Sequence, residues 1–290
     1  MLQKNIVKQP KAQVEVQISL PWADLEPRKG VYNFTVIQSL LDLVASYDKY
    51  LTIEFRDRCM GCGTPYIFPS YLINEGLIAP TTSGYIAKVW DGRIIDYELA
   101  LFSAFSIQFD AHPYLAGIVT PESATGVATR PFSFQQLTDQ YKRLITGMHK
   151  ALPTTLFLHG FNWLGGPNDR IYLDQLVASA DINASGIRWP DTIPPRCVSV
   201  DWAAPAIEQE IGNKLPKQAH IATVNLQKCS PPTTVEELYN YAVKTLNAHY
   251  LIWVSWAVSP APYDFYRDVV PFVTAHPTTN IQCPENIRCQ

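Results

Sequence analysis

Acidic side chains close several short apolar runs of the sequence, and two of them are distinguished by their neighbours. Glu54 lies near the end of one run together with Arg56, and Glu122 follows another. A carboxylic acid that donates a proton, beside a carboxylate that stays ionised, is the usual pair for acid–base chemistry. Charges inside a strand are costly unless they are paired, so Glu54 and Arg56 fit a polar site and a buried ion pair equally well.

Short apolar runs alternate with longer segments of helical spacing. The predicted strands are Val14–Ser19, Leu51–Arg56, Tyr114–Thr120, Thr155–Gly160, Ser185–Arg188, Ile221–Gln227 and Leu251–Trp256. The predicted helices are Phe34–Tyr47, Ile94–Phe109, Phe134–Leu152, Asp169–Ser179, Trp202–Ile211 and Val235–Ala248. This alternation is typical of a parallel sheet wrapped by helices, and no GxGxxG follows a predicted strand, which argues against a dinucleotide-binding sheet. The pattern predicts a (β/α)8 TIM-type barrel that is abbreviated or irregular in its first strand–helix unit.

Period-two alternation divides each predicted strand into a face toward the helices and a face toward the barrel interior. Glu54 and Arg56 then point inward, as do the even-numbered positions that end at Glu122. Barrel enzymes carry their chemistry at the carboxyl ends of the strands. The side chains expected at that rim are Glu54, Arg56, Glu122, His159, Asp191, Gln227 and Trp256. His159 equally fits a hydrogen-bonded strand end, and Asp191 equally fits a turn.

The length of 290 residues fits two domains of ordinary size and one α/β barrel equally well. With the barrel pattern, we expect one domain over residues 1–290, with peripheral tails at 1–13 and 277–290. Hydrophobic residues make up 47% of the chain and charged residues 17%, which suits a large core and argues against disorder. The net charge is −3 and no basic block occurs, so nucleic acid and anionic membranes are not expected partners. No apolar run is long enough to cross a bilayer.

The segment 57–91 is longer than a simple connection needs, and such loops are usually functional.

Six cysteines bear on the compartment in which the protein works. Cys59 and Cys62 form a lone CxxC without the second pair that a zinc ribbon needs, so a loop disulfide is the favoured interpretation. Two further pairs are open, Cys197 with Cys229 and Cys283 with Cys289. Disulfides predict a secreted or extracytoplasmic protein. The first ten residues lack the apolar middle of a signal peptide, so the chain stays in the cytosol or an upstream segment has been removed.

Three segments carry a resemblance to a known family. Residues 22–34, WADLEPRKGVYNF, resemble clan A glycoside hydrolases such as β-galactosidases and cellulases, where a strand ends in W-x-x-x-E-P-x-x-G-x-Y-[DN]-F. Residues 112–123 are similar to the fourth strand of that clan, whose terminal Glu is the general acid/base. Residues 251–256 are similar to its eighth strand, whose terminal Trp forms the floor of a sugar subsite. The resemblance implies a barrel that cleaves a β-linked oligosaccharide or polysaccharide without a metal or organic cofactor.

The resemblance gives Glu122 the place of the general acid/base. For the second carboxylate, the predicted strand faces make Glu54 the first choice, as an inward Glu on the neighbouring strand, before Asp191 and then Asp57. The expected substrate-binding residues are Trp22, Arg56, His159, Asn162, Trp163, Trp189, Gln227 and Trp256. Each of these tryptophans is equally compatible with packing.

Two positions depart from the pattern of the clan. Pro121 precedes Glu122 where the clan usually has Asn, and Gln227 stands where the clan has its nucleophilic Glu. An amide cannot attack the anomeric carbon as a carboxylate does. Three explanations stay open: the seventh strand is misregistered, another carboxylate serves, or hydrolysis has been lost.

Two other classes of protein therefore compete with the hydrolase. One is a carbohydrate-binding protein derived from such an enzyme, with Glu122 kept and the nucleophile gone. The other is a redox or metal protein built on Cys59 and Cys62, for which no accompanying ligands are visible.

Overall fold

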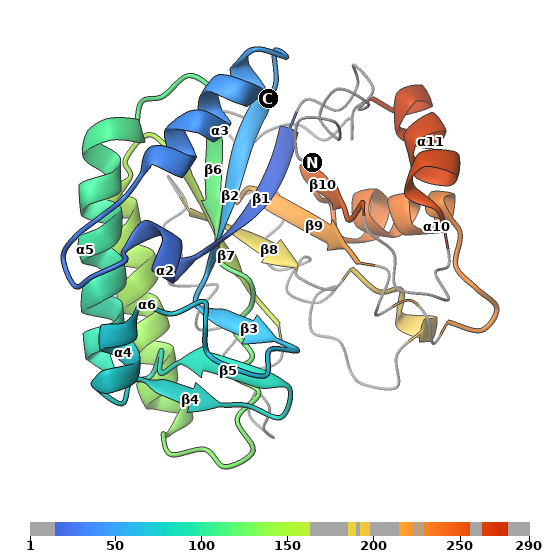
Figure 1. Ribbon diagram of the computed structural model, residues 1–290. Helices are drawn as coiled ribbons and strands as arrows, with labels where there is room; N and C mark the ends of the chain where they lie inside the picture. The colour runs from blue at the N-terminus through green and yellow to red at the C-terminus, as the bar shows by residue number, and fades with distance from the viewer. Residues whose placement is uncertain are drawn as a thin grey trace.

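The computed structural model describes residues 15–162, 185–189, 192–197, 215–222, 226, 229–255 and 263–277. Its main sheet has seven parallel strands, which pair in chain order: β1 Glu15–Pro21, β2 Tyr50–Arg56, β6 Leu115–Val119, β7 Leu156–Gly160, β8 Ser185–Trp189, β9 Lys217–Ile221 and β10 Tyr250–Trp253. The sheet curls into a nearly closed TIM-type (β/α) barrel with helices between its strands, as the sequence predicts (Figure 1).

In the described part of the chain, helices lie between several of the barrel strands. They are α2 Trp22–Leu25, α3 Thr35–Ala45, α4 Ser70–Asn74, α5 Gly92–Phe109, α6 Phe134–Ala151, α10 Val235–Asn240 and α11 Val270–Ala275, with the 3₁₀ turn η1 Pro195–Cys197 and the π-helical segments η2 Tyr241–Thr245 and η3 Phe265–Val269. Of these, α3, α5 and α6 cover the outside of the sheet (Figure 1). The two longest begin at a side-chain cap: Asp91 accepts from the backbone N–H of Arg93, and Ser133 accepts from that of Gln136. None of the described helices is long and apolar enough to cross a membrane.

Most of the observed elements match the predicted ones, with one clear error. The predicted strand Ile221–Gln227 is wrong, because β9 ends at Ile221, where that prediction begins. Lys217, Gln218 and His220 make this strand look polar, although the first two are at most 1% exposed. The predicted helices 169–179 and 202–211 lie outside the described residues.

The long segment after β2 has structure of its own. Its strands β3 Arg58–Met60, β4 Ile78–Pro80 and β5 Gly84–Ala87 form a small antiparallel sheet in the order β3-β5-β4. Together with α4, this sheet follows directly on the carboxyl end of β2 (Figure 1). The insertion therefore stands where the chemistry of a barrel is expected.

A β-bulge in β6 overturns the predicted faces of that strand. Leu51 pairs with Leu115, but the next residue, Thr52, pairs with Gly117, so Ala116 is an extra residue on β6. An extra residue reverses the alternation of everything after it. Gly117 and Val119 therefore share the face of Thr52 and Glu54, and Ile118 shares that of Ile53, opposite to the faces predicted for these three positions of β6.

The two end strands of the described sheet approach each other. Glu15 begins β1 and Tyr250 begins β10. Burial raises the pKa of Tyr250, and the negative charge of Glu15 raises it further. Such coupling requires the two side chains to be near neighbours, which fits a sheet that almost closes on itself.

Two disulfides are present in the described part of the chain. Cys197 is bonded to Cys229, which confirms one predicted pair, and Cys59 is bonded to Cys62. The third predicted pair, Cys283 with Cys289, lies outside the described residues.

Candidate active site

Glu54 lies inside the barrel and is surrounded by hydrogen-bond donors. Its carboxylate accepts from Ser19 Oγ at 2.9 Å and from Gln17 Nε2 at 3.2 Å, both on β1. The guanidinium of Arg188 on β8 lies across the interior, with Nη2 2.8 Å from Glu54 Oε2. Regular alternation along β2 produces this arrangement, because Ile53 and Phe55 point the opposite way into the core.

The charges around Glu54 keep it ionised. Burial by itself would raise the pKa of Glu54, but the positive charges of Arg188 and His220 and the hydrogen bond from Ser19 outweigh burial and lower it. Arg56, two residues along β2, adds to the same effect. Glu54 therefore carries a negative charge at neutral pH while 14% of its side chain stays exposed.

Arg188 connects Glu54 to the segment that carries Glu122. Its Nη1 atom donates to the carbonyl oxygen of Pro121 at 2.7 Å and to that of Thr120 at 3.2 Å. The Arg188 side chain is 3% exposed. Sequence reasoning missed this residue, although an arginine within a predicted buried strand signals a partner that only the fold can supply.

Glu122 is held at the carboxyl end of β6 by Asn162, which follows β7. The Asn162 side-chain amide donates to Glu122 Oε2, and its oxygen accepts from the backbone N–H of Ala124 at 2.8 Å. Ser123 Oγ donates to the Asn162 carbonyl at 3.0 Å and accepts from its N–H at 2.9 Å. The orientation of Glu122 is therefore determined by two neighbouring strands.

A second set of contacts fixes the same segment from the other side. Tyr141 of α6 donates to the carbonyl oxygen of Ser123 at 2.9 Å, and Arg58 of β3 donates to that of Ala124 at 2.5 Å. Asp57 accepts from two nitrogens of Arg58, each at 2.8 Å. The small inserted sheet thus helps to position Glu122.

Asp57, the third choice for the second carboxylate, is engaged in that ion pair. It is 4% exposed and both of its oxygens accept from Arg58. Burial, reinforced by the nearby charge of Asp57, raises the pKa of Glu98 on α5 well above its usual range. The Asp57–Arg58 pair therefore lies in a buried structural cluster, and Glu54 has the more accessible carboxylate.

His159 lies between β7 and the helix layer. It is 1% exposed, its Nδ1 atom is 2.9 Å from Thr120 Oγ1, and its ring centroid is 4.8 Å from that of Tyr141 on α6. Burial, with a smaller contribution from Arg58, lowers the pKa of His159 to about 3. A neutral, enclosed imidazole in this layer cannot contact a substrate inside the barrel, so its predicted binding role finds no support here.

Two tryptophans expected to bind substrate are buried in the core. Trp22 is fully buried against Phe55, at 5.2 Å between ring centroids, and its Nε1 atom donates to Glu26 at 2.8 Å. Glu26 also accepts from Tyr71 at 2.9 Å, so it organises the turn after β1. Trp189 is 2% exposed. Neither indole offers a face to a sugar, and the physical reason is that both pack into the hydrophobic core.

The remaining predicted residues divide into two groups. Arg56 is half-buried and points to the same side of β2 as Glu54, and Asn162 contacts Glu122 directly. Asp191, Trp163, Gln227 and Trp256 lie outside the described residues. Within the described part of the chain, no three or more His, Cys, Asp and Glu side chains gather closely enough to hold a metal ion.

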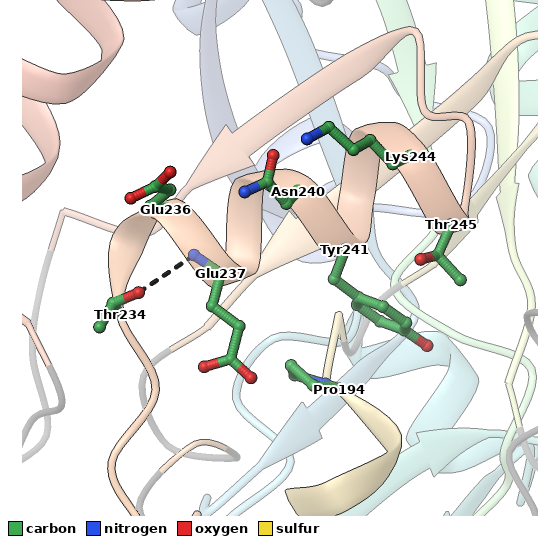
Figure 2. Close-up of a pocket in the computed structure, with 8 residues that line it drawn as sticks. All are labelled: Pro194, Thr234, Glu236, Glu237, Asn240, Tyr241, Lys244 and Thr245. Carbon is green, nitrogen blue, oxygen red and sulfur yellow. Dashed lines mark hydrogen bonds between the residues drawn. The ribbon is translucent and has the colours of Figure 1, made fainter.

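A separate hollow of about 520 Å³ lies on α10 and η2, outside the barrel. Figure 2 shows its lining, which includes Glu236, Glu237, Tyr241 and Lys244. Glu237 already accepts from Nε and Nη2 of Arg196, at 2.6 Å each. This hollow contains none of the predicted catalytic residues and belongs to the outer helix layer.

Comparison with known proteins supports the fold. The chain resembles the catalytic domain of β-amylase from Paenibacillus polymyxa, with a TM-score of 0.62 at 9% identity over 93% of both chains. It resembles endo-glycoceramidase II from Rhodococcus sp., described as a lactosyl-enzyme intermediate, with a TM-score of 0.57 at 12% identity over 86% of this chain and 66% of that one. It also resembles a β-galactosidase from the haloarchaeon Halorubrum lacusprofundi, with a TM-score of 0.58 at 11% identity over 88% of this chain and half of that one.

These proteins bear out the expected resemblance to clan A glycoside hydrolases at the level of the fold. No protein-family model matches the chain, and no curated protein sequence does. The chain spans only part of the length of the glycoceramidase and the galactosidase.

Proposed function

We propose that this protein hydrolyses glycosidic bonds in a β-linked oligosaccharide or polysaccharide. Glu122 acts as the general acid/base and Glu54 as the second carboxylate. The observation that carries the proposal is the Arg188 bridge, in which one guanidinium contacts Glu54 and the backbone immediately before Glu122. Glycosidic cleavage requires two carboxyl groups that flank the scissile bond. Glu54 lies on β2 and Glu122 follows β6, the strand next to it.

The surroundings of the two glutamates favour different tasks. Glu54 is kept ionised by Arg188, His220 and Ser19, which suits a nucleophile or a base. Glu122 is oriented by an amide hydrogen bond from Asn162 and forms no ion pair among the described residues, which suits the general acid/base. Arg56 and Asn162 are the described groups that would bind sugar hydroxyls.

The proposed substrate class is supported by the names of proteins that have a similar fold. The glycoceramidase is described as a lactosyl-enzyme intermediate and the haloarchaeal protein is named a β-galactosidase, and both share the fold. We extend this to a β-linked carbohydrate for the present chain, with Trp163, Gln227 and Trp256 as further predicted contacts. The two disulfides favour an oxidising compartment, so we also propose that the protein is secreted.

The first experiment measures hydrolysis of aryl β-glycosides and β-linked oligosaccharides by Glu122→Gln, Glu54→Gln and Asp191→Asn. Loss of the acid/base or the second carboxylate should lower kcat by about 10² to 10⁴. Glu237→Gln, which changes an ion-paired carboxylate on α10, is the matched control and should keep full turnover. A large loss in Asp191→Asn with an unaffected Glu54→Gln would transfer the second role to Asp191.

A second experiment separates the two roles by their products. With azide and a reactive aryl β-glycoside, Glu122→Ala of a retaining enzyme gives the β-glycosyl azide, because azide replaces water in the second step. Glu54→Ala gives the α-glycosyl azide, because azide then attacks in place of the carboxylate. Unchanged hydrolysis in both variants would contradict the proposed function, and sugar binding without any turnover in the wild type would identify a carbohydrate-binding protein.

A further inference from the structure

We infer that Arg188 is the positioning residue of this site, holding the Glu54 carboxylate in one orientation relative to the backbone that carries Glu122. The inference rests on the proposed function and adds a third residue to it. Arg188 itself is enclosed and would touch neither the sugar nor the scissile bond, since its side chain is only 3% exposed. Its action would pass through its two partners.

The contacts of Arg188 are divided between its two terminal nitrogens. Nη2 lies 2.8 Å from Glu54 Oε2, whereas Nη1 donates to Pro121 O at 2.7 Å. Because a guanidinium is planar and rigid, these two contacts fix the direction of the carboxylate relative to the peptide. A lysine could not hold the two partners in this fixed geometry, because its single ammonium group lacks two terminal nitrogens in one plane.

The strand β7, between Arg188 and the end of β6, leaves room for the bridge. Gly160 of β7 pairs with Arg188 in register. A side-chain carbon on Gly160 would come within 2.6 Å of Pro121 O, the atom that Arg188 contacts. The absence of a side chain at position 160 lets the guanidinium reach across β7 to the end of β6.

A purely structural ion pair is the competing interpretation, and it makes a different prediction. Such a pair would affect the stability of the barrel and the titration of Glu54, because its charge lowers the pKa of that carboxyl, but it would leave kcat of the folded enzyme unchanged. A positioning residue must in addition change how fast the bound substrate reacts. Arg188→Met removes the charge and the fork, and Arg188→Lys keeps the charge alone. Arg196→Met, which breaks the exposed pair with Glu237, is the matched control.

The experiment combines steady-state kinetics with direct titration. For Arg188→Met we expect kcat to fall about ten- to a hundredfold with KM changed less than about threefold, because the bound substrate meets a misplaced carboxylate. The acidic limb of the kcat/KM profile should move up by about one pH unit or more, since Glu54 loses its main cation. Arg188→Lys should restore the position of the limb and only part of kcat.

Titration of the Glu54 side-chain carbon by ¹³C NMR, assigned with Glu54→Gln, tests the charge coupling without any turnover. The same upward movement of the Glu54 midpoint is expected in Arg188→Met and is absent in Arg196→Met. If Arg188→Met does not fold, Arg188→Lys tests the inference instead: its kcat should fall while the acidic limb of its kcat/KM profile stays at the wild-type pH.

The inference is overturned if folded Arg188 variants keep the kcat of Arg196→Met, whether or not the Glu54 titration moves. That result leaves the proposed function standing when Glu122→Gln and Glu54→Gln are inactive. Full activity of those two glutamine variants would instead remove the proposed function and, with it, the role of Arg188.

Discussion

A β-carbon on Gly160 would lie 2.6 Å from the carbonyl oxygen of Pro121 and 2.7 Å from the backbone nitrogen of Glu122. No side chain tolerates backbone contacts this short, so the end of β6 can lie against β7 only because position 160 is glycine. The segment that bears the proposed acid/base is therefore seated directly on the neighbouring strand, and its height above the barrel depends on one missing methyl group.

Gly160→Ala should displace the backbone of Pro121 and Glu122 away from β7. We expect the free energy of unfolding to fall by about 1–3 kcal/mol and turnover to fall about tenfold or more, because the added carbon pushes Glu122 outward. Urea unfolding and kcat measurements check the two effects. Gly63→Ala is the control, since a β-carbon there meets nothing within 4 Å and the backbone needs no left-handed conformation. Equal behaviour of the two variants would show that the segment yields without cost.

Asn162→Ala should disconnect Glu122 from β7. The variant loses the donor to the Glu122 carboxylate and the acceptor for the Ala124 N–H. We expect kcat to fall about ten- to a hundredfold, with a smaller change in KM. Gln38→Ala removes a comparable amide–carboxylate contact, to Asp42 on exposed α3, and should leave turnover as it is. A normal kcat in Asn162→Ala would mean that the remaining contacts orient Glu122 unaided.

His159 should make the protein sensitive to acid. Its pKa is about 3 in the folded state against an ordinary 6.5, so between these values the unfolded chain binds a proton that the folded chain refuses. Stability from this group is complete above pH 6.5 and declines as the pH falls, by about 2 kcal/mol at pH 5. Urea unfolding of His159→Gln at pH 7 and pH 5 should show a smaller difference than the wild type. An identical difference would assign the acid sensitivity to other groups.

The Cys197–Cys229 disulfide should stabilise the carboxyl-terminal half of the barrel. It joins η1 to the segment before α10 and closes a loop of 32 residues in sequence separation. Replacing both cysteines by alanine should lower the free energy of unfolding by about 2–4 kcal/mol, mainly because the unfolded chain gains freedom. Thermal unfolding of the double variant, compared with the wild type under reducing and oxidising conditions, measures this. Reducing agent should leave the Tm of the double variant closer to its oxidised value than that of the wild type.

The sequence predicted the barrel and the inward position of Glu54 because β2 is regular. Its alternating positions carry the hydropathy pattern without interruption, so period two gives the correct faces. The faces of β6 could not be predicted, because the bulge at Ala116 depends on pairing with β2 and has no local signal in the chain. β9 was misplaced because Lys217 and Gln218 are buried by contacts that only the fold provides.

The site itself shows the same limit. Glu122 and Asn162 could be named as candidates from their positions after strands, but their contact arises from two strands that lie side by side. Arg188 could not be paired with Glu54 from spacing, because β2 and β8 meet only across the interior of the closed sheet. Trp22 has the right type for a sugar platform, yet its packing on Phe55 leaves no free face.

The extra residue at Ala116 shifts the inward–outward alternation of β6 by one position. Every position after it, up to the end of β6, is assigned to inside or outside by that single count. Deletion of Ala116 would bring Leu115 and Gly117 into succession opposite Leu51 and Thr52, which removes the bulge and keeps Ile118 and Val119 on their present faces. An added residue that pairs regularly would instead exchange the two faces. A side chain at Gly117 would meet the Leu156 carbonyl oxygen at 2.9 Å, so β6 is restricted in both its length and its sequence.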